Sequence, residues 1–201
     1  MPSPLAPPDE KPVKAFASQK AWGQWLEKNH TKHTGLWVRL MKKDSGIKSI
    51  TYAEALEEAL CHGWIDGQKR SYDETSWLQK FSPRGKKSLW SKINRDKITA
   101  LEKAGRLKPA GLAVVHAAKA DGRWDAAYDS QGSATVPEDF AALLEKHAKA
   151  KKFFATLKGA SRYAILFRLQ TAKKPETRVK KMNDFITMLK NGEAPYLIKP
   201  K

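Results

Sequence analysis

The sequence predicts an α+β protein, with a small antiparallel sheet of about three strands packed by helices and an all-helical C-terminal region. Two observations support this fold class. In the first half, extended segments rich in aromatic and β-branched residues alternate with helical patterns. After residue 137 the apolar residues follow helical spacing alone.

Two helices and three strands are expected early in the chain. Ser18 is placed to cap a helix over residues 19–29. Thr51 and Glu54 have the spacing of a capping box, and Gly63 ends the helix that they begin. The three expected strands, of which the last two form a hairpin, are residues 36–41, 64–72 and 77–81.

The later elements are expected to be helices. One starts at Ser88, ends at Ala104 and turns Ile93 inward, and the next covers residues 109–120. A last helix begins at Pro175. Its expected buried stripe consists of Val179, Met182, Phe185, Ile186 and Leu189.

Composition divides the chain into five predicted segments. Five prolines among the first 12 residues indicate a disordered start, and a run of Asp, Ser, Gly and Ala indicates a linker. The segments are a disordered lead-in (1–15), an α+β core (16–124), a linker (125–137), a basic helical region (138–192) and a tail (193–201).

The charge of the chain is strongly positive and unevenly distributed. The net charge is +17, and residues 146–201 contain 15 Lys and Arg against 3 Asp and Glu. Such an excess attracts anionic partners, namely nucleic acid, acidic protein surfaces or anionic lipid headgroups.

Cysteine count and hydropathy bear on the compartment. A single cysteine, Cys61, fits a reducing environment. Neither a secretory signal nor an apolar run long enough to span a membrane occurs, so the expected location is the cytoplasm.

A ligand pocket is predicted between the turn that follows the second helix and the basic loop at residues 82–88. Arg84 would hold a small anion or a partner's acidic group, with hydroxyl donors beside it and indole walls. The structural alternative is that Asp66 caps the next segment or pairs with Arg84. Ser88 would then cap the helix that follows it, and the loop charges would be solvated. The predicted pocket residues are Trp64, Asp66, Arg84, Ser88, Trp90, Ser91 and Asn94.

A second hypothesis assigns nucleic-acid binding to the basic C-terminal helices. Phosphate contacts there would be independent of base sequence, whereas the alternative is a lysine-rich solubilising surface. The candidate residues are Lys151, Lys152, Lys173, Lys174, Arg178, Lys180 and Lys181.

A third hypothesis is an enzyme centred on Asp66 and Arg84, with Cys61 beside His62 as a possible thiolate pair. Neighbouring residues of a helix point about 100° apart, and Cys61 continues an apolar stripe, so packing is the favoured role for its thiol. We assign no catalytic residue. The histidine spacing supports no metal site, and no cofactor is expected.

Several motifs resemble the YdeI/OmpD-associated, or bacteriocin-protection, family. They are residues 54–67 (EALEEALCHGWIDG), 81–84 (FSPR), 88–91 (SLWS), 105–111 (GRLKPAG), 122–124 (GRW) and 172–178 (AKKPETR). His62 stands where that family usually has an aromatic residue. The resemblance implies a non-enzymatic role in stress or antimicrobial protection, sometimes through an outer-membrane partner, and implies no catalytic residues.

Overall fold

The computed structural model describes residue 9 and residues 11–196. The described residues form two compact units: residues 9, 11–88 and 94–125 make the first, and residues 89–93 and 126–196 make the second. The predicted lead-in at 1–15 lies largely outside the described residues, and the predicted tail at 193–201 does so from residue 197 onward.

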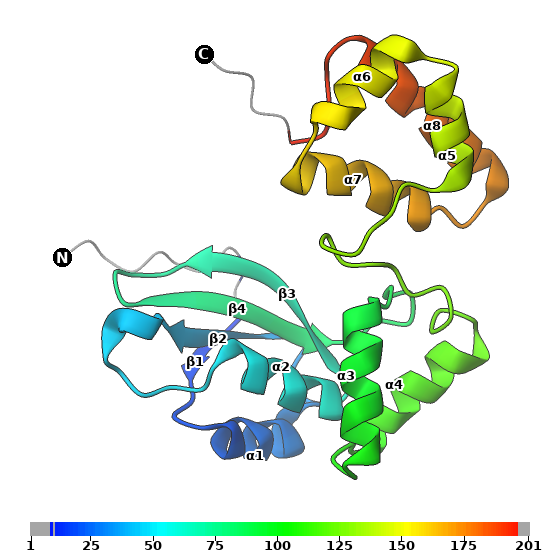
Figure 1. Ribbon diagram of the computed structural model, residues 1–201. Coiled ribbons are helices and arrows are strands. Elements are labelled where there is room, and N and C mark those ends of the chain that lie inside the picture. Colours follow the sequence, from blue (N-terminus) through cyan, green and yellow to red (C-terminus); the bar gives the residue numbers. More distant parts are fainter. Residues whose placement is uncertain (1–8, 10, 197–201) are drawn as a thin grey trace. The chain divides into compact units, whose positions relative to one another are not determined.

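The first unit is built on a four-stranded sheet (Figure 1). Its strands are β1 (Val13–Ala15), β2 (Leu36–Met41), β3 (Trp64–Ser71) and β4 (Ser76–Pro83), in the order β1-β2-β4-β3. β1 pairs with β2 in parallel, and the other neighbours are antiparallel. The α+β class is therefore confirmed, and the expected count of three strands is corrected to four.

The additional strand falls inside the segment that we expected to be disordered. Val13, Lys14 and Ala15 pair with Trp37, Val38 and Arg39 of β2. Three residues are too few to show an alternating pattern, so this strand depends on its partner and leaves no local signal.

Two helices, α1 (Gln19–Asn29) and α2 (Tyr52–Cys61), lie on one face of the sheet (Figure 1). Both begin as predicted, because the Ser18 hydroxyl accepts from the Ala21 amide and Thr51 with Glu54 forms a complete capping box. A short 3₁₀ turn, η1 (Lys43–Ser45), joins β2 to α2. The helices α3 (Lys92–Lys103) and α4 (Pro109–Ala120) follow the hairpin.

Aromatic rings form the centre of the first unit. The indole of Trp22 lies 5.8 Å from Phe81 of β4 and 6.4 Å from Trp64 of β3, measured between ring centroids. Trp22 Nε1 donates to the Ala55 carbonyl at 3.0 Å, which ties α1 to α2. Burial of these rings fixes the two helices against the sheet.

The start of α3 differs from the prediction. The helix begins at Lys92 and not at Ser88, because the chain before it pairs with a distant residue. Tyr128 donates its amide to the Trp90 carbonyl at 2.9 Å and accepts from the Lys92 amide at 2.9 Å. Ile93, which we expected to face inward, is 49% exposed.

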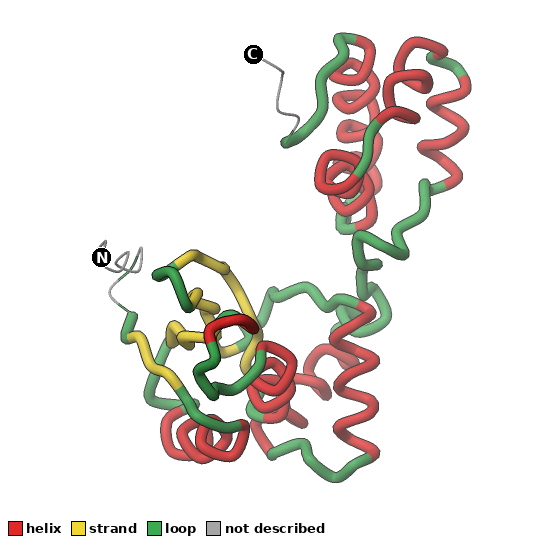
Figure 2. Tube along the Cα trace, turned by 60° about the vertical axis from the view of Figure 1, so that its left-hand side comes forward, coloured by secondary structure: helices red, strands yellow, loops and turns green. Residues whose placement is uncertain are grey.

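The second unit contains helices and loops but no strand among its described residues (Figure 2). Its helices are α5 (Glu138–Glu145), α6 (Ala148–Thr156), α7 (Gly159–Gln170) and α8 (Pro175–Lys190). Phe140, Phe154, Ile165, Phe185 and Leu189 are among the residues of its continuous apolar core. Val179, expected in the buried stripe of the last helix, is instead 51% exposed.

Candidate functional site

Trp64, a predicted pocket wall, lies in the hydrophobic core. It is 1% exposed, and its ring meets Trp22 and Trp25 edge to face at centroid distances of 6.4 and 6.0 Å. Its indole nitrogen donates to the His30 carbonyl at 3.2 Å. The Trp64 side chain thus packs α1 against β3.

The backbone brings the Trp64 turn beside the Arg84 segment. Trp64 is paired with Pro83 across the β3–β4 ladder, and the Arg84 amide donates to the Gly63 carbonyl at 2.9 Å. Arg84 is 8% exposed. The two segments that the predicted pocket requires are therefore neighbours within the first unit.

The remaining predicted pocket residues are distributed over both units. Ser88 and Asn94 belong to the first unit, while Trp90 and Ser91 belong to the second. Trp90 is 1% exposed, and Ser91 forms an isolated bridge with Tyr128. A shared pocket for all seven residues stays a prediction.

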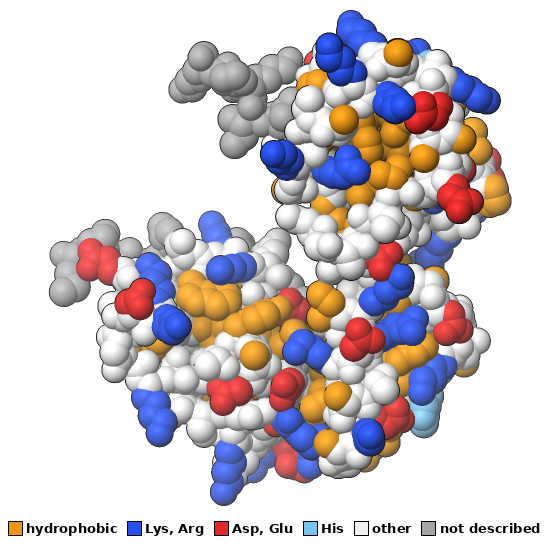
Figure 3. Space-filling view, in the orientation of Figure 1, with side chains coloured by type: hydrophobic (Ala, Val, Ile, Leu, Met, Phe, Trp, Pro, Cys, Tyr) orange, Lys and Arg blue, Asp and Glu red, His pale blue; other side chains and the backbone are white. Residues whose placement is uncertain are grey.

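Asp66 takes part in a surface cluster that the sequence interpretation missed. Its carboxylate accepts from the Tyr52 hydroxyl at 2.7 Å, and the Tyr52 ring lies 6.2 Å from Trp77. Lys69 Nζ stands 4.3 Å from the centroid of the Trp77 ring. Burial, with the Asp66 charge beside it, raises the pKa of Tyr52. Figure 3 shows apolar side chains exposed between α2 and the β3–β4 hairpin.

One signal for this cluster was present in the sequence. Tyr52 directly follows the helix cap at Thr51, so its side chain leaves the first turn of α2. The pairing with Asp66 depends on the sheet register, in which Asp66 opposes Phe81, and that register cannot be read from local spacing.

The adjacent Cys61 and His62 occupy the buried end of α2. Cys61 is 1% exposed, and burial raises the pKa of its thiol to about 11, so the thiol stays protonated at neutral pH. His62 Nδ1 lies 2.9 Å from the Glu58 carbonyl oxygen. These environments are those of packing residues rather than of an activated nucleophile.

The comparisons with known proteins match two consecutive parts of the chain. Residues 14–114, half of the sequence, match the model described as Domain of unknown function (DUF8412). The chain belongs to the DUF8412 family. No curated protein and no solved structure matches it significantly.

A second family model covers the C-terminal part of this DUF8412 protein. Residues 133–192 match the model described as Bacteriocin-protection, YdeI or OmpD-Associated, which confirms the resemblance and gives the chain a YdeI/OmpD-associated domain. The motif at 54–67 falls in the DUF8412 region, whereas the motif at 172–178 falls in the second match. The chain thus joins two family regions.

The YdeI/OmpD-associated domain contains 13 Lys and Arg against 5 Asp and Glu. Among the described residues, two of those cations pair with a carboxylate: Arg178 with Asp139 at 2.7 Å, and Lys151 with Glu145 at 2.7 Å. Arg178 also donates to the Leu169 carbonyl. Its guanidinium therefore joins α8 to α5 and to the end of α7.

The other predicted nucleic-acid residues differ in their contacts. Lys181 Nζ donates to the Arg168 carbonyl at 3.3 Å. The ammonium groups that form no hydrogen bond or ion pair within the described part of the chain, and whose residues are exposed, are those of Lys152, Lys173, Lys174 and Lys180. Four of the seven candidates are thus fully available to a partner.

The domain also has a hollow between α7 and α8. It has a volume of about 510 Å³ and is lined by Arg168, Lys181, Asp184, Phe185, Met188 and Glu193 to Pro195. None of the residues of the predicted Arg84 pocket lines it.

In residue 9 and residues 11–196, no group of three or more His, Cys, Asp or Glu side chains is arranged to hold a metal ion. No helix within those same residues combines the length and apolar character that crossing a bilayer requires.

Proposed function

We propose that this protein acts by binding rather than by catalysis, and that its YdeI/OmpD-associated domain binds an acidic surface of another protein. The supporting observation is the charge of that domain. Of its 13 cations, two pair with a carboxylate among the described residues. Unpaired surface cations raise the local potential and speed association with an acidic partner.

Both ion pairs are internal to the domain and hold its helices together. Their carboxylates are therefore engaged and do not neutralise the other surface cations. Asp139 to Arg178 links α5 to α8, and Glu145 to Lys151 links α5 to α6. The three carboxylates that are left, Glu138, Glu176 and Asp184, are too few to neutralise the surface. An acidic partner would provide the missing counter-charge.

The description of the matching family is compatible with such a role. It refers to protection and to association with another protein. Protection by association requires a binding surface and no chemical conversion, and the buried, protonated Cys61 gives no support to a thiol mechanism.

Titration of the protein against labelled polyglutamate at low and moderate salt tests the proposal. Replacement of Lys152, Lys173, Lys174 and Lys180 by Gln should weaken binding about tenfold or more, and added salt should weaken it further. The matched control replaces the exposed Lys20, Lys28, Lys32 and Lys43 of the first unit, with the same loss of charge. Equal losses in both variants would show that net charge alone is responsible.

Nucleic acid is the second candidate, favoured by the same unpaired cations. A duplex DNA arm in the same titration separates the two. If DNA binds more tightly than polyglutamate and its affinity falls linearly with salt on logarithmic axes, the domain is a sequence-independent nucleic-acid binder. If neither polyanion binds at low salt, the surface is a solubilising one and the proposal is wrong.

A further inference from the structure

We infer that the hollow between α7 and α8 is a binding site for a small amphiphilic monocarboxylate, a molecule with one carboxylate and an apolar chain. This inference goes beyond the proposed acidic-protein surface, because it rests on a concave site and on different side chains. A volume of about 510 Å³ lies within the range of sites that enclose small ligands.

The floor of the hollow is apolar. Phe185 is 6% exposed and Met188 is half-buried, and both project from α8. Ala194 and Pro195, from the segment after α8, line the same hollow. These side chains offer a hydrocarbon chain an apolar surface to cover, and covering it removes that surface from water.

Two cationic side chains also line the hollow. Arg168 comes from α7 and Lys181 from α8, and the Lys181 ammonium is held beside Arg168 by donating to its backbone carbonyl at 3.3 Å. Neither side chain forms an ion pair with a carboxylate among residue 9 and residues 11–196. The Arg168 guanidinium donates to the Ala164 carbonyl at 3.4 Å and has further N–H groups to offer. A guanidinium and an ammonium that line the same hollow suit a carboxylate head group.

The apolar surface continues on the other side of Arg168. A second hollow of about 240 Å³ is lined by Arg168, Tyr163, Phe167 and Tyr196, among others. The Arg168 guanidinium thus lies between two apolar hollows, 5.7 Å from the centroid of the Tyr196 ring. A ligand whose hydrocarbon chain is longer than the first hollow can therefore extend over the apolar surface of the second.

Tyr196 supplies an independent sign of a binding site. Its backbone is left-handed, with a φ of 58°, and its side chain is 72% exposed. An aromatic residue in this conformation is strained, and strained residues cluster at ligand clamps. A ligand that covers the exposed ring would remove its apolar surface from water.

The acidic residues that line the hollow restrict the charge that a ligand can carry. Asp184 and Glu193 line the same hollow as the two cations. A second negative charge on the ligand would face these carboxylates, and like charges at close range repel. A monocarboxylate is therefore favoured over a dianionic phosphate monoester, and an alkylamine is disfavoured by Arg168 and Lys181.

Chemical-shift titration of the full-length protein with decanoate, below its micellar concentration, tests the site. We expect shifts in α7, α8 and residues 193–196 and a higher melting temperature. Decanol, decylamine and decyl phosphate should bind more weakly, and acetate should not bind. If decanoate causes no shifts, or if decyl phosphate or decylamine binds as tightly, the inference is wrong.

Variants locate the contact. Arg168→Gln and Lys181→Gln should each weaken decanoate binding about tenfold, the value of a hydrogen bond to a charged group. Lys180→Gln removes the same charge from the same helix outside the hollow and should leave affinity unchanged. Met188→Trp should block the apolar floor while keeping both cations. Unchanged affinity in Arg168→Gln and Met188→Trp would overturn the inference.

The outcome is separable from that of the proposed function. The variant with Lys152, Lys173, Lys174 and Lys180 replaced keeps Arg168 and Lys181, so it should bind decanoate normally even where it loses polyglutamate. Loss of decanoate binding in that variant would contradict a site formed by Arg168 and Lys181.

Discussion

His62 has a buried polar atom that forms no hydrogen bond among the described residues. The side chain is 3% exposed, Nδ1 lies 2.9 Å from the Glu58 carbonyl oxygen, and Nε2 is buried without a hydrogen-bond partner in the described structure. The Glu58 carbonyl also accepts from the His62 amide at 3.3 Å. This carbonyl would therefore stay bonded if the imidazole were replaced.

We expect His62→Phe to stabilise the protein by about 1 kcal/mol, because a buried unsatisfied polar group is removed and a ring of similar shape remains. Urea denaturation followed by Trp fluorescence measures this change. The control His116→Phe alters an exposed histidine and should be nearly neutral. A lower denaturation midpoint for His62→Phe would show that Nε2 has a favourable role.

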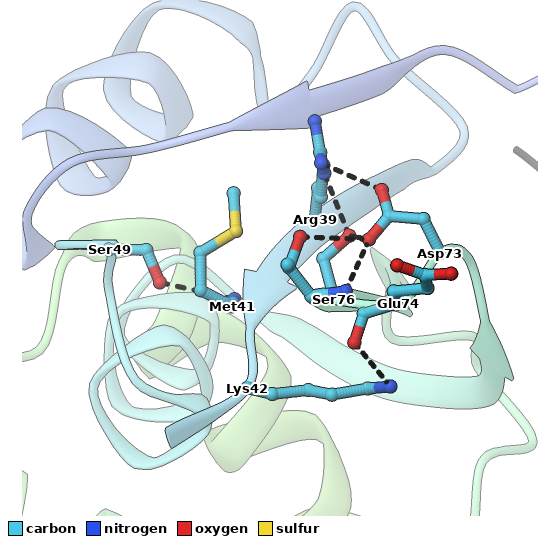
Figure 4. Close-up of polar contacts among 8 residues, drawn as sticks. Arg39, Met41, Lys42, Ser49, Asp73, Glu74 and Ser76 are labelled. Atoms are coloured by element: carbon cyan, nitrogen blue, oxygen red, sulfur yellow. Dashed lines mark hydrogen bonds and ion pairs between the residues drawn. The ribbon is translucent and has the colours of Figure 1, made fainter. Parts of the chain in front are cut away.

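Asp73 accepts several hydrogen bonds in the turn between β3 and β4 (Figure 4). Its carboxylate accepts from the Ser76 hydroxyl at 2.7 Å and from the Thr75 amide at 2.9 Å, and it pairs with Arg39 at 2.7 Å. The Ser76 bond first, then those from Thr75 and the Arg39 charge, lower the pKa of Asp73 from 3.8 to about 2. The ionised form thus stabilises the turn between β3 and β4.

The sign of the resulting pH dependence follows from this lowered pKa. The contribution of Asp73 is complete above its ordinary value of 3.8 and is lost as the pH falls towards 2. We expect Asp73→Asn to lower stability at neutral pH and to flatten the loss between pH 4 and 2, as measured by urea midpoints across that range. Asp44→Asn, in an exposed 3₁₀ turn, is the control. Identical acid profiles for wild type and Asp73→Asn would contradict the assignment.

At the scale of elements, the contact between α2 and α4 depends on a glycine. A Cβ at Gly111 would stand 2.3 Å from the Cys61 carbonyl oxygen and 3.0 Å from that of Leu60. The Lys108 amide donates to the same Cys61 carbonyl at 3.0 Å. The start of α4 therefore lies directly against the end of the α2 backbone.

We expect Gly111→Ala to destabilise the protein by about 1–3 kcal/mol, because backbone must move to admit the methyl group. Gly23→Ala is a matched control within α1. Its Cβ would meet the flexible end of Glu58 at 2.9 Å, and the gain in helix propensity is about 1 kcal/mol. Thermal melts should separate the two variants. Comparable midpoints would indicate that α4 shifts freely against α2.

Elements with strong local signals were predictable from the sequence, and elements made by distant pairing were not. Ser18 and the Thr51 capping box fixed the starts of α1 and α2 because a cap is a property of three or four neighbouring residues. β1 and the late start of α3 depend on β2 and on Tyr128, respectively. No periodicity in either segment encodes these partners.

The candidate site shows the same limit. Sequence reasoning selected Trp64 for its neighbours along the chain, but the ring is directed into the core by contacts with Trp22 and Trp25. Sequence reasoning did identify the basic C-terminal helices, because the charge of a segment can be counted from its own residues. The hollow at Arg168 and the Tyr52 contact of Asp66 require tertiary geometry, so neither could be predicted.

At the scale of the whole molecule, the C-terminal family region has a hydrophobic cluster of its own. The described apolar core of the second unit extends from Phe140 to Leu189, and the partly buried side chains around it lie between Ala134 and Ala194. All of these residues belong to the C-terminal part of the chain. The predicted domain boundary at residues 125–137 remains a proposal that this distribution supports.

We therefore expect a fragment of residues 126–201 to fold by itself. Its core is complete without residues 89–93, although the bonds of Tyr128 to Trp90 and Lys92 and the ion pair of Lys92 with Asp129 are lost. A core of this size supplies at most about 3–5 kcal/mol, so the fragment should be helical but only marginally stable. Circular dichroism with a cooperative thermal transition would confirm this expectation. A fragment extended to residue 89, which adds α3 and α4, is the comparison: if it alone folds, residues 89–125 contribute to the helical domain and the boundary does not lie at 125–137.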